Sequence, residues 1–89
     1  MTPAWDDRGM FRKFEYPVPV LTVDVPSQPA QHRSVFWTGT TRSLAQAFSE
    51  LSLVAARDGA NEVIGVRVIR SGHEHRLEYE AYGTGIWFA

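Results

Sequence analysis

The residues with the clearest capacity for chemistry are two histidines that flank a glutamate, in the run His73-Glu74-His75. On a strand, residues two apart point to the same face with Cα atoms about 6.5–7 Å apart, so the two imidazoles could share one ion. Zn²⁺ takes about four ligands, and Glu74 would point the other way. Two interpretations stay open: His73 and His75 belong to a divalent-metal site between subunits, or they are polar residues of a hairpin tip.

No other group of side chains in the sequence predicts a catalytic site. Glu78 and Glu80 share a face of a predicted strand, but Arg67 is expected opposite Glu78, which favours a structural ion pair. The chain has no cysteine, which excludes disulfides, cysteine-rich metal sites and thiol catalysis. The sequence also has no G-x-S-x-G nucleophile elbow, no P-loop and no G-x-G-x-x-G motif. We therefore predict that the protein is not an enzyme.

Composition narrows the class of protein. A chain of 89 residues makes one domain that buries about 60–65% of its unfolded surface, and such small domains often gain stability by oligomerisation. The net charge of −1 and the scattered basic residues predict no nucleic-acid partner. No basic-then-apolar N-terminus and no long apolar stretch occurs, so we expect no membrane partner and a cytoplasmic location.

The prolines divide the chain, because all five lie within the first 29 residues. We predict a proline-rich N-terminal arm over residues 1–30 and a compact domain over residues 31–89. Within the arm, residues 18–25 predict a short strand that Pro19 confines to the edge of a sheet. Residues 34–38 are aromatic and β-branched up to Gly39, which predicts the first strand of the domain.

A helix is the clearest local prediction. Leu44, Phe48, Leu51 and Ala55 recur at helical spacing. Ser43 with Gln46 three residues later matches a capping box, and Gly59 suits the left-handed residue that ends a helix.

The last third of the chain predicts a hairpin, with strands over residues 63–70 and 75–82. A two-residue turn at Gly72-His73 would suit a type II′ geometry, which takes glycine first. The resulting register gives each strand an apolar face. It pairs Val68 with Leu77, Val66 with Tyr79, Ile64 with Ala81, Arg67 with Glu78 and Val63 with Tyr82.

The second strand of this hairpin extends beyond its partner. Residues 83–88 would then need the first strand, the N-terminal arm or another subunit as a partner. The predicted fold class is α+β, a two-layer β-α-β-β with one helix on a three-stranded antiparallel sheet, plus the short N-terminal edge strand. One helix covers one face, so apolar residues on the other face predict an oligomer interface. With the C-terminal residues, this interface comprises Val63, Ile69, Tyr82, Ile86, Trp87 and Phe88.

Two motifs carry a resemblance to a known family. A helix ending in G-A-N, a V-x-G-V-R strand and a final strand with A-Y-G-T together resemble the YbjQ-like family, over about residues 41–88. The stretch Gly39-Thr40-Thr41 is shorter than its equivalent in the family. The matching motif residues are Gly59, Ala60, Asn61, Gly65, Arg67, Tyr82, Gly83 and Thr84.

The resemblance implies a subunit like that of dodecin and ring-like homo-oligomers, such as a pentamer or a multiple of it. It implies no catalytic residue, and the family's heavy-metal-binding label leaves a divalent metal open. Dodecins store flavins on a tryptophan at the start of the second strand, where this chain has Asn61-Glu62-Val63, so a flavin is disfavoured. The leading hypothesis is a self-assembling scaffold or binding module without a cofactor. The alternative is a small-molecule or metal-ion binder with its ligand at subunit interfaces.

Overall fold

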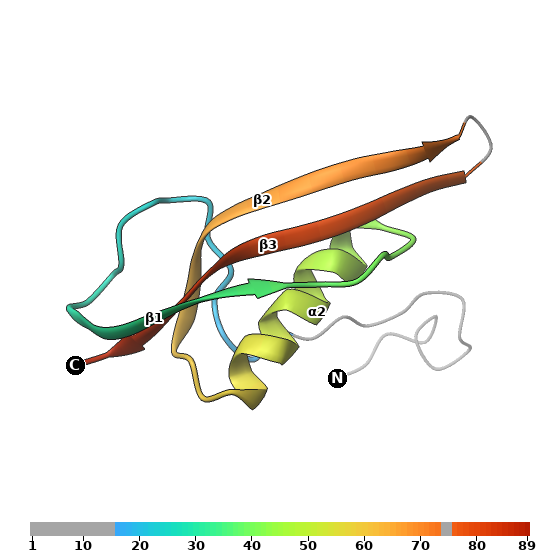
Figure 1. The fold of residues 1–89 in the computed structure, drawn as a ribbon. Helices are drawn as coiled ribbons and strands as arrows, with labels where there is room; N and C mark the ends of the chain where they lie inside the picture. The colour runs from blue at the N-terminus through green and yellow to red at the C-terminus, as the bar shows by residue number, and fades with distance from the viewer. Residues whose placement is uncertain (1–15, 74–75) are drawn as a thin grey trace, which may run out of the picture.

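A helix packs on one face of a sheet in the computed structural model, which describes residues 16–73 and 76–89 (Figure 1). In these residues the strands form a three-stranded antiparallel sheet with the order β1-β3-β2. The predicted α+β class with β-α-β-β order is confirmed. The elements are β1 (Ala30–Trp37), α2 (Leu44–Arg57), β2 (Glu62–His73) and β3 (Arg76–Phe88).

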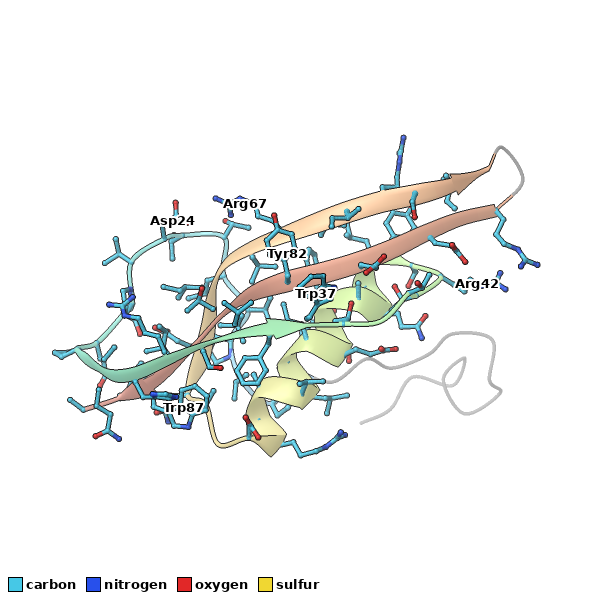
Figure 2. The ribbon with its side chains drawn as sticks, in the orientation of Figure 1. Asp24, Trp37, Arg42, Arg67, Tyr82 and Trp87 are labelled. Carbon is cyan, nitrogen blue, oxygen red and sulfur yellow. The ribbon has the colours of Figure 1, made fainter. Side chains whose placement is uncertain are left out.

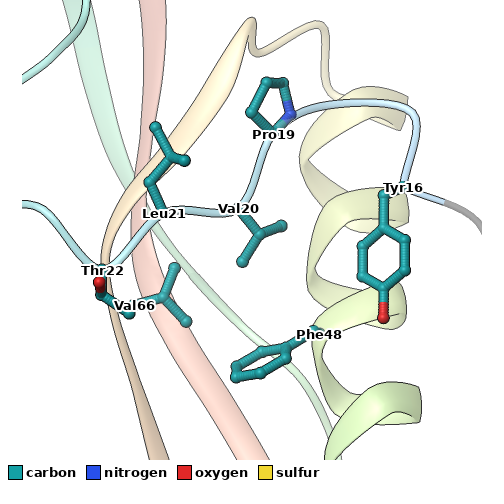
Figure 3. A pocket seen from close by; sticks show the side chains of 7 residues that line it. All are labelled: Tyr16, Pro19, Val20, Leu21, Thr22, Phe48 and Val66. Atoms are coloured by element: carbon teal, nitrogen blue, oxygen red, sulfur yellow. The ribbon is translucent and has the colours of Figure 1, made fainter.

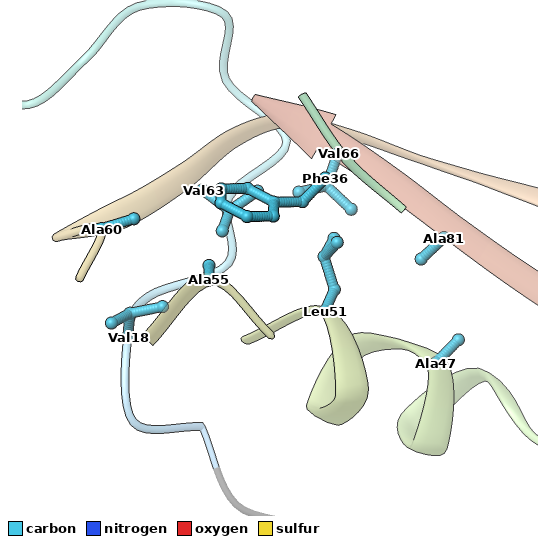
Figure 4. Close-up of a cluster of buried hydrophobic side chains, with 9 residues drawn as sticks. All are labelled: Val18, Phe36, Ala47, Leu51, Ala55, Ala60, Val63, Val66 and Ala81. Atoms are coloured by element: carbon cyan, nitrogen blue, oxygen red, sulfur yellow. The ribbon is translucent and has the colours of Figure 1, made fainter. Parts of the chain in front are cut away.

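Helix α2 begins and ends where the sequence predicts. The hydroxyl of Ser43 accepts the backbone N–H of Gln46 at 3.1 Å, which satisfies a donor that the first helical turn leaves unpaired. Gly59 has a φ of 90°, in the left-handed region that favours glycine after a helix. Ala47, Leu51 and Ala55 are fully buried on the face toward the sheet (Figure 4), so the helical spacing of apolar residues selects the packed face.

Strand β3 is the central strand, and β1 is the partner of its C-terminal half. Ser34 lies opposite Gly85 and Trp37 opposite Tyr82. The first strand is therefore the partner that residues 83–88 need, from the alternatives that the sequence leaves open. Position 85 has no side chain, and a Cβ there would meet the Cδ2 atom of Phe36 at 2.7 Å. The ring of Phe36 thus packs directly over the backbone of β3, inside the core.

The predicted register of the β2–β3 hairpin is wrong. Val68 lies opposite Ala81 and Arg67 opposite Tyr82, whereas Val68 was expected opposite Leu77. Gly72 is paired within the ladder, opposite Leu77, despite its φ of 116°, and His73 pairs with Arg76, so the predicted two-residue turn at Gly72-His73 is wrong. The observed partner lies four residues further along β3. From Arg67 onward this even shift leaves the side chains on their predicted faces, so hydrophobic alternation in that part of β2 could not distinguish the two registers.

A β-bulge interrupts β2 between Ile64 and Arg67. Ile64 lies opposite Thr84 and Arg67 opposite Tyr82, so Gly65 and Val66 together oppose the single residue between those two. Gly65 supplies the positive φ of 62° that such bulges use. An extra residue inverts the alternation of faces. Val63 and Val66 accordingly both belong to the core, and the prediction that Val63 shares the outer face with Tyr82 is wrong.

The N-terminal arm takes the edge position that the sequence predicts, beside β2. Val20 and Val63 form a parallel bridge, and Leu21 exchanges backbone hydrogen bonds with Val63 at 2.8 Å and Val66 at 3.0 Å. The pairing is too irregular to make a full strand. Val18 joins the buried cluster on the helix side, so the arm contributes to the same core as the domain. The cluster in Figure 4 comprises Val18, Phe36, Ala47, Leu51, Ala55, Ala60, Val63, Val66 and Ala81.

Candidate functional site

The face of the sheet opposite α2 carries an exposed apolar surface, which we call the outer patch. It consists of Val35 and Trp37 from β1, Tyr82 from β3 and Ile69 from β2, with exposures of 66%, 63%, 37% and 45%. Residues that pair directly across strands share a face. Trp37, Tyr82 and Arg67 form one such row, and Figure 2 shows them side by side across the three strands. The outer patch thus spans the full width of the sheet.

Strand alternation positions the side chains of the outer patch. Val35 and Trp37 flank Phe36 on β1, and because Phe36 points into the core, its two neighbours point outward. The rings of Trp37 and Tyr82 lie with centroids 6.5 Å apart at an angle of 45°. The indole Nε1–H of Trp37 donates to Glu80 Oε1 at 3.3 Å. These contacts hold the exposed indole in place, so the outer patch is pre-organised.

Charged side chains of both signs border the outer patch. Glu80 lies opposite Ile69 and accepts the hydrogen bond from Trp37. Arg67 donates to the carbonyl of Thr22 at 3.3 Å and forms an ion pair with Asp24 at 3.4 Å. Both partners of this ion pair are largely exposed, so it contributes little to stability. The Arg67 side chain is 49% exposed, so part of it is accessible for contacts beyond the subunit.

The arm covers the other end of this face. Glu62 and Ile86 pair across the strands, and both are buried. The Glu62 carboxylate accepts the backbone N–H of Ser27 at 2.8 Å and its hydroxyl at 2.7 Å. Ile64, on the same face, is buried as well. The segment around Ser27 is thus held over the end of the face near the C-terminus, which leaves the outer patch as its open part.

The six residues predicted for an oligomer interface do not lie together on one surface. Ile69 and Tyr82 belong to the outer patch. Val63 and Ile86 are fully buried within the subunit, so their side chains present no surface to a partner. Trp87 lies on the helix side, where its ring contacts those of His32 and Phe36 at centroid distances of 4.8 and 5.9 Å. Phe88 is partly buried beside Ala30.

Sequence reasoning missed Val35 and Trp37. The signal was available, since a buried Phe36 on a paired strand implies that both its neighbours point to the opposite face. The N-terminal arm obscured it, because the sequence did not indicate which part of the face the arm would cover.

Most of the residues that match the YbjQ-like motifs have a role in backbone geometry and do not form a surface. Asn61 joins the helix end to β3, because its Oδ1 accepts the N–H of Phe88 at 2.8 Å and its own N–H donates to Ile86 at 2.7 Å. Ala60 is buried in the core. Gly65 and Gly83 face each other in the bulge, while Gly59 ends the helix and Thr84 is partly buried on β3. Arg67 and Tyr82 are exposed on the outer face, where Thr84 is also located but is partly buried.

The histidine pair remains a prediction. His75 lies outside the described residues, and the side chain of His73 is likewise not described. In residues 16–73 and 76–89, no group of three or more histidine, aspartate or glutamate side chains is arranged to hold a metal ion. The described part of the chain also contains no helix with the length and apolarity needed to cross a membrane.

Comparisons with known proteins give no match to a family model, to a curated protein or to a solved structure.

Proposed function

We propose that this protein is a non-enzymatic, self-assembling domain that associates with further copies of itself through the outer patch and acts as an oligomeric scaffold or binding module. One observation carries the proposal: Trp37, on the edge strand β1, is exposed on an apolar sheet face and oriented by its neighbours. Exposed apolar surface of this kind marks interaction sites, and tryptophan, tyrosine and arginine are the residue types most often dominant in interfaces. The likeness of the glycine motifs to the ring-forming YbjQ-like family supports the same proposal.

The partner that binds the outer patch is a second copy of the chain, because the outer patch is complementary to itself. A two-fold axis parallel to the strands would place β1 of one copy over β2 of the other. Trp37 of each subunit would then face Arg67 of its partner, in a cation–π contact made twice. Such two-fold interfaces use the same surface on both subunits. The acidic Glu80 beside the same indole would complement that guanidinium.

A ring would need a second, head-to-tail contact, which free strand edges provide. In the described residues β1 pairs with β3 alone, so its other edge is open. The arm leaves β2 after bonding Gly65 and Val66, so the β2 edge beyond them is open too. Unpaired edges are natural sites for pairing with another chain. An edge of β1 against β2 of the next subunit would close a ring or extend it.

The test compares two lysine substitutions at matched exposure on opposite faces. Ile69 is 45% exposed in the outer patch, and Leu77 is 44% exposed elsewhere on the hairpin. Ile69→Lys places its ammonium opposite Glu80, a favourable cross-strand pair, so the fold is expected to persist. Light-scattering mass should exceed the monomer for the unmodified protein, fall for Ile69→Lys and stay high for Leu77→Lys.

Two results would contradict the proposal. The unmodified protein would show the monomer mass at every concentration measured, or both lysine variants would dissociate to the same extent. Circular dichroism of each variant checks that the secondary structure is retained, and Trp37→Ser provides an independent removal of the outer patch.

A further inference from the structure

A cavity of about 420 Å³ lies on the helix side, between the N-terminal arm, α2 and β2 (Figure 3). It is remote from the outer patch, because it opens beside the helix and not on the uncovered face. The arm curves around one side of it, with Phe48 and Val66 opposite (Figure 3). We call it the arch pocket, and its lining residues are Tyr16, Pro19, Val20, Leu21, Thr22, Phe48 and Val66.

The arch is the segment of the N-terminal arm that curves around the pocket, and it is fixed at both of its ends. At the helix, the buried hydroxyl of Ser52 accepts the N–H of Val18 at 3.0 Å and donates to its carbonyl at 2.7 Å. At the sheet, Leu21 is bonded to both Val63 and Val66. The Tyr16 hydroxyl also donates to the carbonyl of Ala45 at 3.2 Å. The walls are therefore held in place by the fold, as in most small-molecule pockets, which are largely pre-formed.

The walls define the chemistry of a ligand. Most lining side chains are apolar, and none is charged. An ionised group would lose its hydration there without a partner, which is strongly unfavourable. The ligand is consequently neutral and mostly apolar, and the cavity volume lies within the range of about 300–1,000 Å³ for small-molecule sites.

A few polar groups on the arch could orient such a ligand. Thr22 and Tyr16 both line the cavity, and their side-chain oxygens are the polar atoms available to a ligand there. A single hydrogen-bonding group on the ligand would suffice to use one of them.

We propose that the arch pocket binds a small, neutral, predominantly apolar molecule that carries one hydrogen-bonding group. Binding takes place within one subunit and does not depend on assembly. The probe is N-phenyl-1-naphthylamine, a neutral naphthylamine whose fluorescence rises in apolar surroundings. The unmodified protein shows saturable binding, and the amide resonances that shift are those of Val20, Thr22 and Phe48.

Two matched variants locate the site. Val20→Phe fills the pocket, whereas Val25→Phe adds the same ring on the same arm at a position that is 72% exposed and outside the lining. Binding weakens by roughly tenfold or more in Val20→Phe, equivalent to about 1.4 kcal/mol, and is unchanged in Val25→Phe. If Val20→Phe fails to fold, the resonances of the unmodified protein still decide the location.

Three results would overturn the inference: no saturable binding, equal loss in both phenylalanine variants, or shifts centred on Trp37 and Tyr82. The variant Ile69→Lys separates this inference from the proposed function. It keeps the probe affinity even where it lowers the oligomer mass. A loss of probe binding in that variant would place the probe between subunits and refute the arch pocket.

Discussion

The bulge in β2 leaves no room for a side chain at Gly83, on the facing part of β3. A Cβ at this position would lie 2.7 Å from Val63 Cγ1, 3.0 Å from the carbonyl oxygen of Ile64 and 3.0 Å from Val66 Cγ2. Real Cβ atoms essentially never approach other heavy atoms below 3.0 Å. Val63 is fully buried and cannot rotate into solvent, and the Ile64 oxygen belongs to the backbone. The substitution Gly83→Ala must therefore move the bulge or separate β2 from β3.

The expected cost follows from this crowding. Overpacking of a well-packed core costs about 1–3 kcal/mol, and Ala in place of Gly recovers about 0.4–1 kcal/mol by restricting the unfolded chain. A mid-range net loss of about 1.3 kcal/mol corresponds to a Tm lower by roughly 5–10 °C for a domain of this size. Urea and thermal unfolding, followed by circular dichroism, measure both quantities.

Gly39→Ala is the matched control, since a Cβ at Gly39 meets nothing within 4 Å. Its free energy of unfolding should stay within about 0.5 kcal/mol of the unmodified protein or rise slightly. If Gly83→Ala and Gly39→Ala unfold at the same urea concentration, then the side chains of β2 do not pack against the backbone of Gly83, and the reasoning fails.

Three further substitutions test the elements that position the sites. Gly65→Ala forces a side chain into a φ of 62°, so urea unfolding should show a loss of about 1–2 kcal/mol; an unchanged midpoint would contradict the bulge. Ser52→Ala leaves the N–H and C=O of Val18 without their hydrogen-bond partner. The free energy of unfolding should fall by about 1–3 kcal/mol, with faster amide exchange at Val18. Equal exchange would show that the arm is held by other contacts. Ser27→Ala removes the hydroxyl donor to Glu62 and should cost about 1–2 kcal/mol in thermal unfolding, whereas a change below about 0.3 kcal/mol would show that the backbone N–H of Ser27 holds the arm alone.

The helix and the order of elements were predictable because their signals are local. Ser43 and Gln46 are three residues apart and bond to each other within one turn, and Gly59 ends the helix by its own backbone freedom. The central position of β3 was less certain. Residues 83–88 clearly needed a partner, but three partners satisfied the pattern equally, and only tertiary packing selects β1.

The register and the burial of Val63 and Ile86 were not predictable for a different reason. Gly72 and Gly65 both have positive φ, yet one lies within a paired strand and the other forms a bulge. A glycine in a sequence indicates that such a conformation is allowed, without indicating which kind of irregularity uses it. The bulge changes the face of Val63, so a strictly alternating pattern assigned Val63 to the surface. The arm then buries Ile86 through contacts that are distant in sequence.

The same bulge explains why the two motifs of the family resemblance occur together. With Val63 in the core, regular alternation would also turn Arg67 toward the helix, where an unpaired charge is very costly to bury. The extra residue at Gly65 lets both requirements be met, and it can form only where the opposing strand has no Cβ, at Gly83. The V-x-G-V-R and A-Y-G-T motifs are therefore two halves of one backbone device. The bulge directs Arg67 to the outer face, where it lies opposite Tyr82, so the fold requirement and the proposed association surface involve the same motifs.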